Sequence, residues 1–467
     1  MVAAKRWIPI VIGLLVIAGA VPLGIAFKEL RDFRYFAQVG IYDIDLPPIT
    51  GFASSYSYTV GDAIPLLVHT TEPATAMLYR LGAVKQPVGK ARPVPATVQP
   101  ATIDRRKGVD WKVTASIPTA GFEPGLYSIE LRQNAAPDHV YAIAVILKPR
   151  QAPPIAILAS TNTWDAYNEF GGFSNYANRY IDGKLMKALR AFKEFPIDMF
   201  HLPRNRPNDA ISQDLLRLSE PFSEYTDRLV EDEWQLIAFI ERAGYDYAVY
   251  SDPDMAFTEE PISGRVLILN GHAEYWTPEM FTQLQRYMDR GGKLLVSAGN
   301  PLFRSGVFTN QGLLIFPEDM PREYVNRLIG TYFDHLGRGT SAPYAIRKPS
   351  HWVFTGVDRR KQLGIGCTYV LSRGTGEAGG GSGLFTQKIG IGSDQFETLA
   401  VGMNDWGPAY MVYRDTAAGG WVFNSSSGSF TSCLNADPSA AQIVTNLLDE
   451  ATGKRALRPG RFTQVSD

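Results

Sequence analysis

The sequence lacks the residues on which several classes of protein depend. It has only two cysteines, Cys367 and Cys433, which excludes a cysteine-rich zinc module and a dense disulfide framework. One disulfide between them and two buried free thiols are both compatible with the sequence. The 46 basic and 47 acidic side chains nearly cancel, so no basic field indicates a nucleic-acid partner. Gly374–Gly383 is glycine-rich but lacks the Lys-Ser/Thr of a phosphate-binding loop, and we expect a flexible surface loop there.

The N-terminus contains one long uncharged stretch, the 21 residues Trp7–Phe27, which follows Lys5 and Arg6. A helix of this length crosses a hydrocarbon core of about 30 Å, and the preceding bases favour a cytoplasmic N-terminus with the bulk of the chain outside. The competing interpretation is a signal peptide cleaved after Ala18-Gly19-Ala20. The first predicts a single-pass cell-membrane protein whose bulk is periplasmic, and the second predicts a secreted protein. Both place the folded part outside the cytoplasm.

Residues 28–50 have the composition of a linker, and residues 51–150 contain short apolar or alternating runs separated by glycine and proline. Ile64–His69 and Val140–Leu147 are two of these runs. Runs at this spacing predict a β-sandwich, which we expect to be immunoglobulin-like. No polar cluster in this part suggests chemistry. We therefore expect a spacer or docking role for it.

Residues 151–455 alternate between apolar strands and amphipathic helices. Strands are expected at Ile155–Ala159, Asp246–Tyr250, Arg265–Asn270 and Lys293–Ala298, and helices at Ile181–Phe192, Glu231–Ala243 and Thr277–Arg290. This alternation predicts an α/β domain with a parallel sheet covered on both faces. Its last third, rich in glycine and aromatic residues, predicts a β-rich elaboration closed by a helix near Ala440–Ala451. Residues 456–467 are a tail.

Polar residues follow three of the predicted strands, at the edge where open parallel sheets bind ligands. If these loops are adjacent, one crevice collects the side chains of Tyr167, Tyr176, His272, Glu274 and Asn300. Singly, each has a structural explanation. A tyrosine in a glycine-rich loop usually packs its ring, and Glu274 also suits the positive end of the helix that begins at Thr277.

Together these segments resemble the C-terminal domain of the N,N-dimethylformamidase large (beta) subunit family. The most specific element is Gly271-His272-Ala273-Glu274-Tyr275-Trp276. The other elements are Ala166-Tyr167-Asn168, Gly171-Gly172, Ser174, Tyr176, Gly291-Gly292, Gly299-Asn300, Gly419–Phe423 and Asn446–Asp449. The resemblance extends over roughly residues 153–452.

The resemblance implies a glutamine-amidotransferase-like (flavodoxin-like) parallel-sheet domain that holds a mononuclear ferric iron through two tyrosinates and one carboxylate. Carried over by position, the iron ligands are Tyr167, Tyr176 and Glu274. Tyr180 and Tyr250 are the next candidates for the second tyrosinate. Three anionic oxygens would neutralise a ferric ion, and hard oxygen donors suit a hard cation.

The same resemblance gives roles to residues around the metal. His272 and Asn300 would orient the ligands or the substrate, and Glu397 would be the acidic general base. A metal with open coordination positions polarises a carbonyl group and lowers the pKa of water, and amide cleavage needs both effects. The sequence therefore predicts an amidohydrolase that cleaves a C–N bond other than a peptide bond in a small amide.

Two other functions stay open. A non-catalytic cell-envelope or carbohydrate-binding protein could use the same fold without the metal. A thiol enzyme using Cys367 is less favoured because no strand–turn–helix elbow surrounds this residue. No nucleic-acid partner is expected, and a homo-oligomer is compatible with the sequence.

Overall fold

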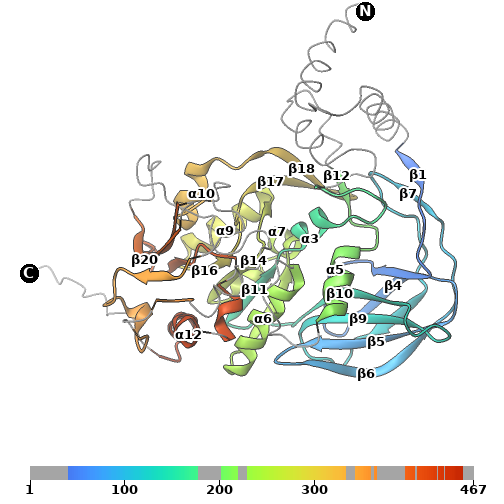
Figure 1. Ribbon diagram of the computed structural model, residues 1–467, viewed down its shortest axis with the longest axis horizontal. Coiled ribbons are helices and arrows are strands. Elements are labelled where there is room, and N and C mark those ends of the chain that lie inside the picture. The colour runs from blue at the N-terminus through green and yellow to red at the C-terminus, as the bar shows by residue number, and fades with distance from the viewer. Residues whose placement is uncertain are drawn as a thin grey trace, which may run out of the picture.

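The computed structural model describes residues 40–176, 201–218, 229–332, 342–358, 362–364, 395–404, 407–428, 430–435 and 437–455 (Figure 1). The expected membrane segment Trp7–Phe27, the expected helix Ile181–Phe192 and the loop Gly374–Gly383 lie outside these residues. Among the helices within them, none is long and apolar enough to cross a membrane. Cys433 is in a disulfide, and Cys367, the other cysteine of the sequence, lies outside the described residues.

The N-terminal part of the described chain is a two-layer β-sandwich. One sheet has the order β3 (Ser57–Thr59), β10 (Val140–Lys148), β9 (Gly125–Gln133), β5 (Ala74–Leu81) and β6 (Lys85–Val94). The other has the order β2 (Ile49–Ala53), β4 (Ala63–Thr70) and β8 (Ala115–Pro118). Leu66 of β4 and Ile129 of β9 are fully buried in one apolar cluster between the sheets. The sandwich agrees with the sequence-based expectation, whereas its immunoglobulin-like type stays a prediction.

The rest of the described chain is built on a mixed eight-stranded sheet. Its order is β13 (Tyr247–Ser251), β11 (Ile155–Ala159), β14 (Val266–Gly271), β16 (Lys293–Ala298), β22 (Trp421–Asn424), β21 (Gly407–Asp415), β20 (Glu397–Asn404) and β19 (Tyr344–Ile346). The first five strands are parallel, and the last three continue the sheet in antiparallel fashion. The parallel strands and the β-rich extension are therefore confirmed, within a mixed α/β architecture.

Helices cover both faces of this sheet (Figure 1). Along β11, Ile157 faces a core shared with α6 (Leu229–Arg242) and α12 (Pro438–Thr452). Leu158 faces the opposite core. That second core includes the helices α7 (Asp252–Phe257), α8 (Glu260–Ser263), α9 (Pro278–Asp289) and α10 (Arg322–Ile329). Successive side chains of a strand point to opposite faces, so an uninterrupted apolar strand such as β11 requires a cover on each face.

The β-sandwich shares the first of these cores and is not a separate spacer. Ala142, Ala144 and Ile146 on the outer face of β10 belong to the same apolar cluster as Trp234 of α6. The indole nitrogen of Trp234 donates to the carbonyl of Gly82 at 2.8 Å. The sandwich is therefore not an independent spacer, because removing it would expose the core beneath it, and the docking role stays a prediction.

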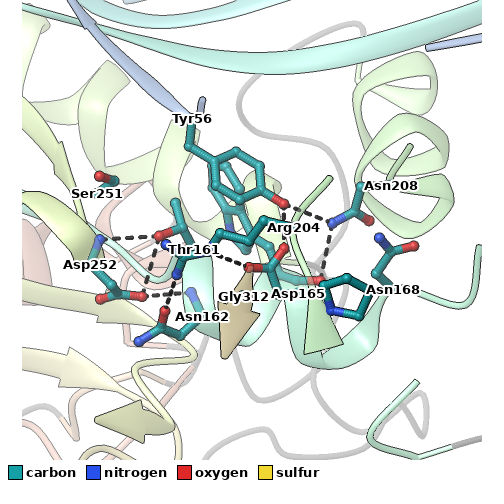
Figure 2. Close-up of polar contacts among 12 residues, drawn as sticks. Tyr56, Thr161, Asn162, Asp165, Asn168, Arg204, Asn208, Ser251, Asp252 and Gly312 are labelled. Carbon is teal, nitrogen blue, oxygen red and sulfur yellow. Dashed lines mark hydrogen bonds and ion pairs between the residues drawn. The ribbon is translucent and has the colours of Figure 1, made fainter. Parts of the chain in front are cut away.

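A buried polar network crosses the junction between the sandwich and the α/β part (Figure 2). Tyr56, from the sandwich, donates to Asp165 Oδ1 at 2.7 Å, and Arg204 Nε bonds Asp165 Oδ2 at 2.9 Å. Arg204 Nη2 donates to Asn162 Oδ1 at 2.6 Å, and the Asn162 backbone N–H donates to Asp252 Oδ2 at 2.7 Å. Burial raises the pKa of Asp252 to about 7 and also raises that of Asp165.

The Tyr56–Asp165 bond predicts that the sandwich contributes to the stability of the whole described chain. Tyr56→Phe removes a donor from a buried carboxylate, which costs about 1–3 kcal/mol. Tyr58→Phe is the matched control, because the Tyr58 hydroxyl makes exposed hydrogen bonds to Ser54 and Ser55 and should matter by only about 0.5 kcal/mol. Urea unfolding measures both, and equal effects of the two substitutions would contradict the assignment.

Asp252 predicts a pH dependence of the free energy of unfolding. In the folded chain the Asp252 carboxyl group has a pKa of about 7 and is mostly protonated below it, whereas an unfolded aspartate ionises near pH 4. The resulting stabilisation is complete below about pH 4 and is lost as the pH rises to about 7, at about 1.4 kcal/mol per pH unit. Asp252→Asn should remove this slope. Parallel stability curves for the two proteins between pH 4.5 and about 6.5 would show that the folded and unfolded pKa values of Asp252 are similar.

Candidate functional site

Three adjacent strand ends carry the candidate site. β14 pairs in parallel with β11 on one side and with β16 on the other, so the segments that follow these strands meet at one edge of the sheet. Gly299, after β16, donates its N–H to the carbonyl of Gly271 at 2.7 Å. Phe303 donates in the same way to the carbonyl of Glu274 at 3.1 Å. The third segment is α3 (Thr161–Tyr167), which begins directly after β11.

The backbone at this edge includes conformations that side chains rarely adopt. Asn300 has a φ of 46° and Leu302 a φ of 58°, both in the left-handed region, which asparagine adopts readily and which costs a residue such as leucine about 1–2 kcal/mol. Gly271, at a φ of 62°, meets the same requirement without a Cβ. Such strain persists only where packing and hydrogen bonds enforce it, and it is concentrated at functional sites.

The centre of the site is a set of oxygen atoms, which we call the oxygen cluster: Tyr167, Tyr176, Glu274 and Tyr275. The Tyr176 hydroxyl lies 3.0 Å and 2.8 Å from the two carboxylate oxygens of Glu274 and 2.5 Å from the Tyr275 hydroxyl. The Tyr167 and Tyr176 ring centroids are 4.4 Å apart. The structure therefore brings together all three residues that the sequence predicts as iron ligands.

Helix α3 holds the oxygen cluster from below. The Glu274 backbone N–H donates to the Thr163 hydroxyl at 3.3 Å, and Asn162 Nδ2 donates to the Tyr275 carbonyl at 3.1 Å. Asn175 donates its amide Nδ2 to the Tyr275 hydroxyl at 2.6 Å. Two of these bonds fix Glu274 and Tyr275 to α3, and the third fixes Tyr275 to the loop that carries Tyr176.

A second, four-stranded sheet packs against the cluster. Its order is β12 (His201–Pro203), β18 (Gly312–Asp319), β17 (Arg304–Thr309) and β15 (Tyr275–Trp276). Leu202, Leu313 and Ile315 from this sheet form a small apolar core with the rings of Tyr167, Tyr176 and Tyr275. The rings are thus packed in an apolar setting, while the Tyr176 hydroxyl bonds Glu274 and the Tyr275 hydroxyl.

Electrostatics keep the Tyr176 phenol protonated in this state. Burial raises its pKa well above the ordinary value, and the negative charge of Glu274 and the phenols of Tyr275 and Tyr167 raise it further. Glu274 itself is only 3% exposed. A buried carboxylate needs such donors, because an uncompensated one costs several kcal/mol.

His272 and Asn300 border the cluster. His272 is 5% exposed, with its ring centroid 6.3 Å from that of Tyr167. A Cβ added to Gly299 would lie 3.9 Å from His272 Cε1, which places the loop containing Asn300 beside the imidazole. Asn300 is 3% exposed. Both residues therefore lie at the strand ends where the sequence placed them.

Glu397 is not brought to this site. It is the first residue of β20, its side chain is half exposed, and its carboxylate pairs with Lys348 at 2.7 Å. β20 is three strands away from β16, which is about 14 Å at the usual spacing of strands. The antiparallel extension carries Glu397 sideways, away from the parallel strand ends, so the expectation that it joins the same crevice is corrected.

The alternative tyrosines do not compete with Tyr176 in the described residues. Tyr250 is buried in the second core, on β13, and Tyr180 lies outside the described residues.

Sequence reasoning missed Tyr275, whose hydroxyl completes the cluster. The signal was its position next to Glu274, but alternation along a strand would turn consecutive side chains apart. The two-residue β15 and the irregular backbone before it place both in one cluster instead.

The chemistry of the oxygen cluster fits a hard metal ion. Within the described residues, no group of three His, Cys, Asp or Glu side chains could hold a metal, and the donors here are phenol and carboxylate oxygens. Neighbouring oxygen ligands of a small octahedral cation, bound at about 2.0–2.1 Å, lie about 2.8–3.0 Å apart. Tyr176 and Glu274 have this separation, which is also that of an ordinary hydrogen bond. The donor types, phenol and carboxylate oxygens, are what fits the ferric ion that the resemblance implies.

Comparisons with curated proteins and with solved structures give no argument about this chain. No curated protein matches the sequence. Among solved structures, a Paenibacillus sp. cycloisomaltooligosaccharide glucanotransferase, complexed with cycloisomaltoheptaose, shares 8% identity with a TM-score of 0.17. The match covers 65% of this chain and 61% of that one, so the chain spans less than two thirds of the length of that structure. A TM-score this low does not indicate a common fold.

A family model matches residues 74–312, just over half of the chain. The matched region begins in β5, earlier than the resemblance suggested, and ends at the start of β18. It contains every residue of the oxygen cluster together with His272 and Asn300, but not Glu397. By this match, the chain belongs to the family described as N,N-dimethylformamidase beta subunit-like, C-terminal.

Proposed function

We propose that this protein is an iron-dependent hydrolase that cleaves the C–N bond of a small amide outside the cytoplasm. Membership of the family suggests an amide-hydrolysing enzyme. The observation that carries the iron site is the convergence of Tyr176 on both oxygens of Glu274, with Tyr167 packed against the Tyr176 ring. A buried set of hard anionic oxygens suits a ferric ion.

Tyr167, Tyr176 and Glu274 would hold the iron in this proposal. When bound, the ion would polarise the amide carbonyl and lower the pKa of water at the site. Tyr275 is not among the ligands that the resemblance implies, and its hydroxyl bonds Tyr176 and Asn175. Its role would be to orient the Tyr176 phenol, as hydrogen-bond partners of ligands generally do.

His272 and Asn300 would act on the substrate. An imidazole takes up and releases a proton near neutral pH, so we assign to His272 the proton-transfer role expected of Glu397. The Asn300 side chain has an amide donor that suits the oxygen on which negative charge develops.

Substitutions at the oxygen cluster test the metal site. Phenolates bound to ferric iron should colour the concentrated protein, and Tyr176→Phe should bleach or shift this absorption band while the ring still packs. Glu274→Gln should weaken iron binding more severely, because a neutral amide is a poorer donor to a hard cation. Tyr275→Phe is the matched control and should keep most of the colour. Visible absorption with amide-hydrolysis assays measures all of these variants.

His272→Ala separates metal binding from turnover. It should keep most of the iron yet lose about 10²–10⁴-fold in hydrolysis, the usual contribution of a positioned general acid or base. Full colour in Tyr176→Phe would mean that Tyr176 is not a ligand. A colourless, metal-free wild-type protein after growth with ample iron would favour a non-catalytic binding protein.

The proposed location rests on the uncharged segment Trp7–Phe27. If it is an uncleaved span, the protein will stay in the membrane fraction after a carbonate wash, and a variant that begins at Arg31 will be soluble. Fractionation and N-terminal sequencing of the mature chain provide the measurement. A mature protein that begins at Val21 and washes off freely would show that the segment is a cleaved signal peptide.

A further inference from the structure

A cavity of about 240 Å³ lies where the β-sandwich meets the α/β part. The sandwich lines it with residues 51–56 and with Ala142–Ala144 of β10, and the α/β part lines it with residues that include Arg204, Asn208 and Ser251. A water molecule occupies about 30 Å³ in the liquid, so the cavity has room for one small organic molecule. Pockets for drug-sized ligands are larger, at about 300–1,000 Å³.

The cavity is separate from the oxygen cluster, because α3 lies between them. Residues three or four apart share one face of a helix. Asn162 and Asp165 of α3 bind Arg204 on the cavity side, whereas Thr163 and Tyr167 face the oxygen cluster. A ligand in the cavity would therefore not touch the oxygen cluster directly.

Arg204 is held in place beside the cavity (Figure 2). Its Nε is engaged by Asp165 and its Nη2 by Asn162, which leaves Nη1 outside these two bonds. The guanidinium also lies over the ring of Phe308, at 4.8 Å from the centroid. The side chain keeps 26% of its surface exposed. A fixed guanidinium with an unused donor nitrogen is well suited to bind an anion.

The charged side chains at the cavity wall are basic, with carboxylates beside them: Arg204 pairs with Asp165, and Arg206 interacts electrostatically with Asp165 and Asp209. Both charged residues that line it are arginines, Arg204 and Arg206. The Arg206 guanidinium is 2% exposed, and its hydrogen bonds go to the backbone carbonyls of Pro203, Phe170, Phe173 and Asn168. Carbonyl groups satisfy its donors without cancelling its charge.

Apolar side chains form one part of the walls, and Ser54, Ser55, Tyr56, Asn208 and Ser251 form another. Phe52, Ala142, Ala144 and Ile211 line the cavity and are nearly inaccessible to solvent. A fully hydrated anion such as inorganic phosphate would lose its water against these walls without compensation. An anion with an apolar body would instead bury that body. The lining thus favours an amphipathic ligand with a single charged end.

We propose that this cavity binds a small monocarboxylate, with its carboxylate on Arg204 and its apolar body between β10 and Ile211. The guanidinium forms strong, charge-assisted hydrogen bonds with carboxylates. The bound acid joins the β-sandwich to the α/β part. The acid is also linked indirectly to Tyr275 of the oxygen cluster. Arg204 bonds Asn162, and Asn162 bonds the Tyr275 carbonyl.

Calorimetric titration of the full-length chain with benzoate tests this site, with benzyl alcohol as the neutral match and inorganic phosphate as the hydrophilic anion. Benzoate should bind saturably, and the other two should not. Ala144→Leu fills the apolar part of the cavity and keeps Arg204, and it should weaken benzoate binding at least tenfold. Arg204→Gln should do the same. Arg80→Gln is the control, because it removes a different ion pair of the same junction, Arg80–Glu241 at 2.5 Å.

Three outcomes would overturn the proposal. The first is no benzoate binding to the wild type, and the second is wild-type affinity in a folded Ala144→Leu protein. The third is loss of binding in Tyr176→Phe with full retention in Ala144→Leu, which would place the benzoate at the oxygen cluster. If Arg204→Gln does not fold, Ala144→Leu and Tyr176→Phe decide between the two sites, and thermal unfolding verifies the fold of each variant.

Discussion

The burial of the Glu274 carboxylate at the end of β14 constrains the whole candidate site. Only 3% of this residue is exposed, and a buried carboxylate without partners costs several kcal/mol. The Tyr176 hydroxyl lies within hydrogen-bond distance of both of its oxygens and donates its one proton to this carboxylate. To keep this partner on Glu274, the loop after α3, the short strand β15 and the small sheet that packs on the tyrosine rings must hold their positions. A metal ion with three anionic oxygen ligands would meet the same electrostatic requirement by replacing the phenol proton with a cation.

Helix α3 transmits this constraint to the rest of the molecule. Thr163 supports the oxygen cluster and Asp165 binds Arg204 and Tyr56 of the sandwich. Asn162 bonds both sides, Arg204 and the Tyr275 carbonyl. The family match begins at residue 74, in β5 of the sandwich. This agrees with the shared core, since the outer face of β10 and the helix α6 bury each other. The sandwich and the α/β part are therefore one structural unit around α3.

Periodicity predicted the parallel sheet well, because an uninterrupted apolar strand has few other stable environments. Ile155–Ala159 and Lys293–Ala298 are strands with the predicted bounds. The same reasoning applied to Val140–Leu147 would have revealed the shared core. A sandwich strand with one solvated face alternates, whereas this run is apolar at nearly every position. The absence of a polar cluster does not distinguish an independent spacer from a packed module, whereas an apolar run such as Val140–Leu147 does.

The positions of Glu397 and Tyr275 could not be obtained from strand patterns. Glu397 depends on how the antiparallel strands extend the sheet beyond β22, and sequence gives no strand order for that region. Tyr275 depends on irregular backbone between β14 and α9, where neither the helical nor the strand period applies. Local patterns thus placed the residues that directly follow regular strands, and they failed where tertiary topology or loop geometry decides.

Elemental analysis of the purified full-length protein, after growth with ample iron, tests the central claim most directly. The account predicts close to a single iron per chain in the wild type and a large loss of iron in Glu274→Gln, with the secondary structure of the variant preserved by circular dichroism. A folded wild-type protein without iron would contradict it. So would a Glu274→Gln protein that retains the full iron content.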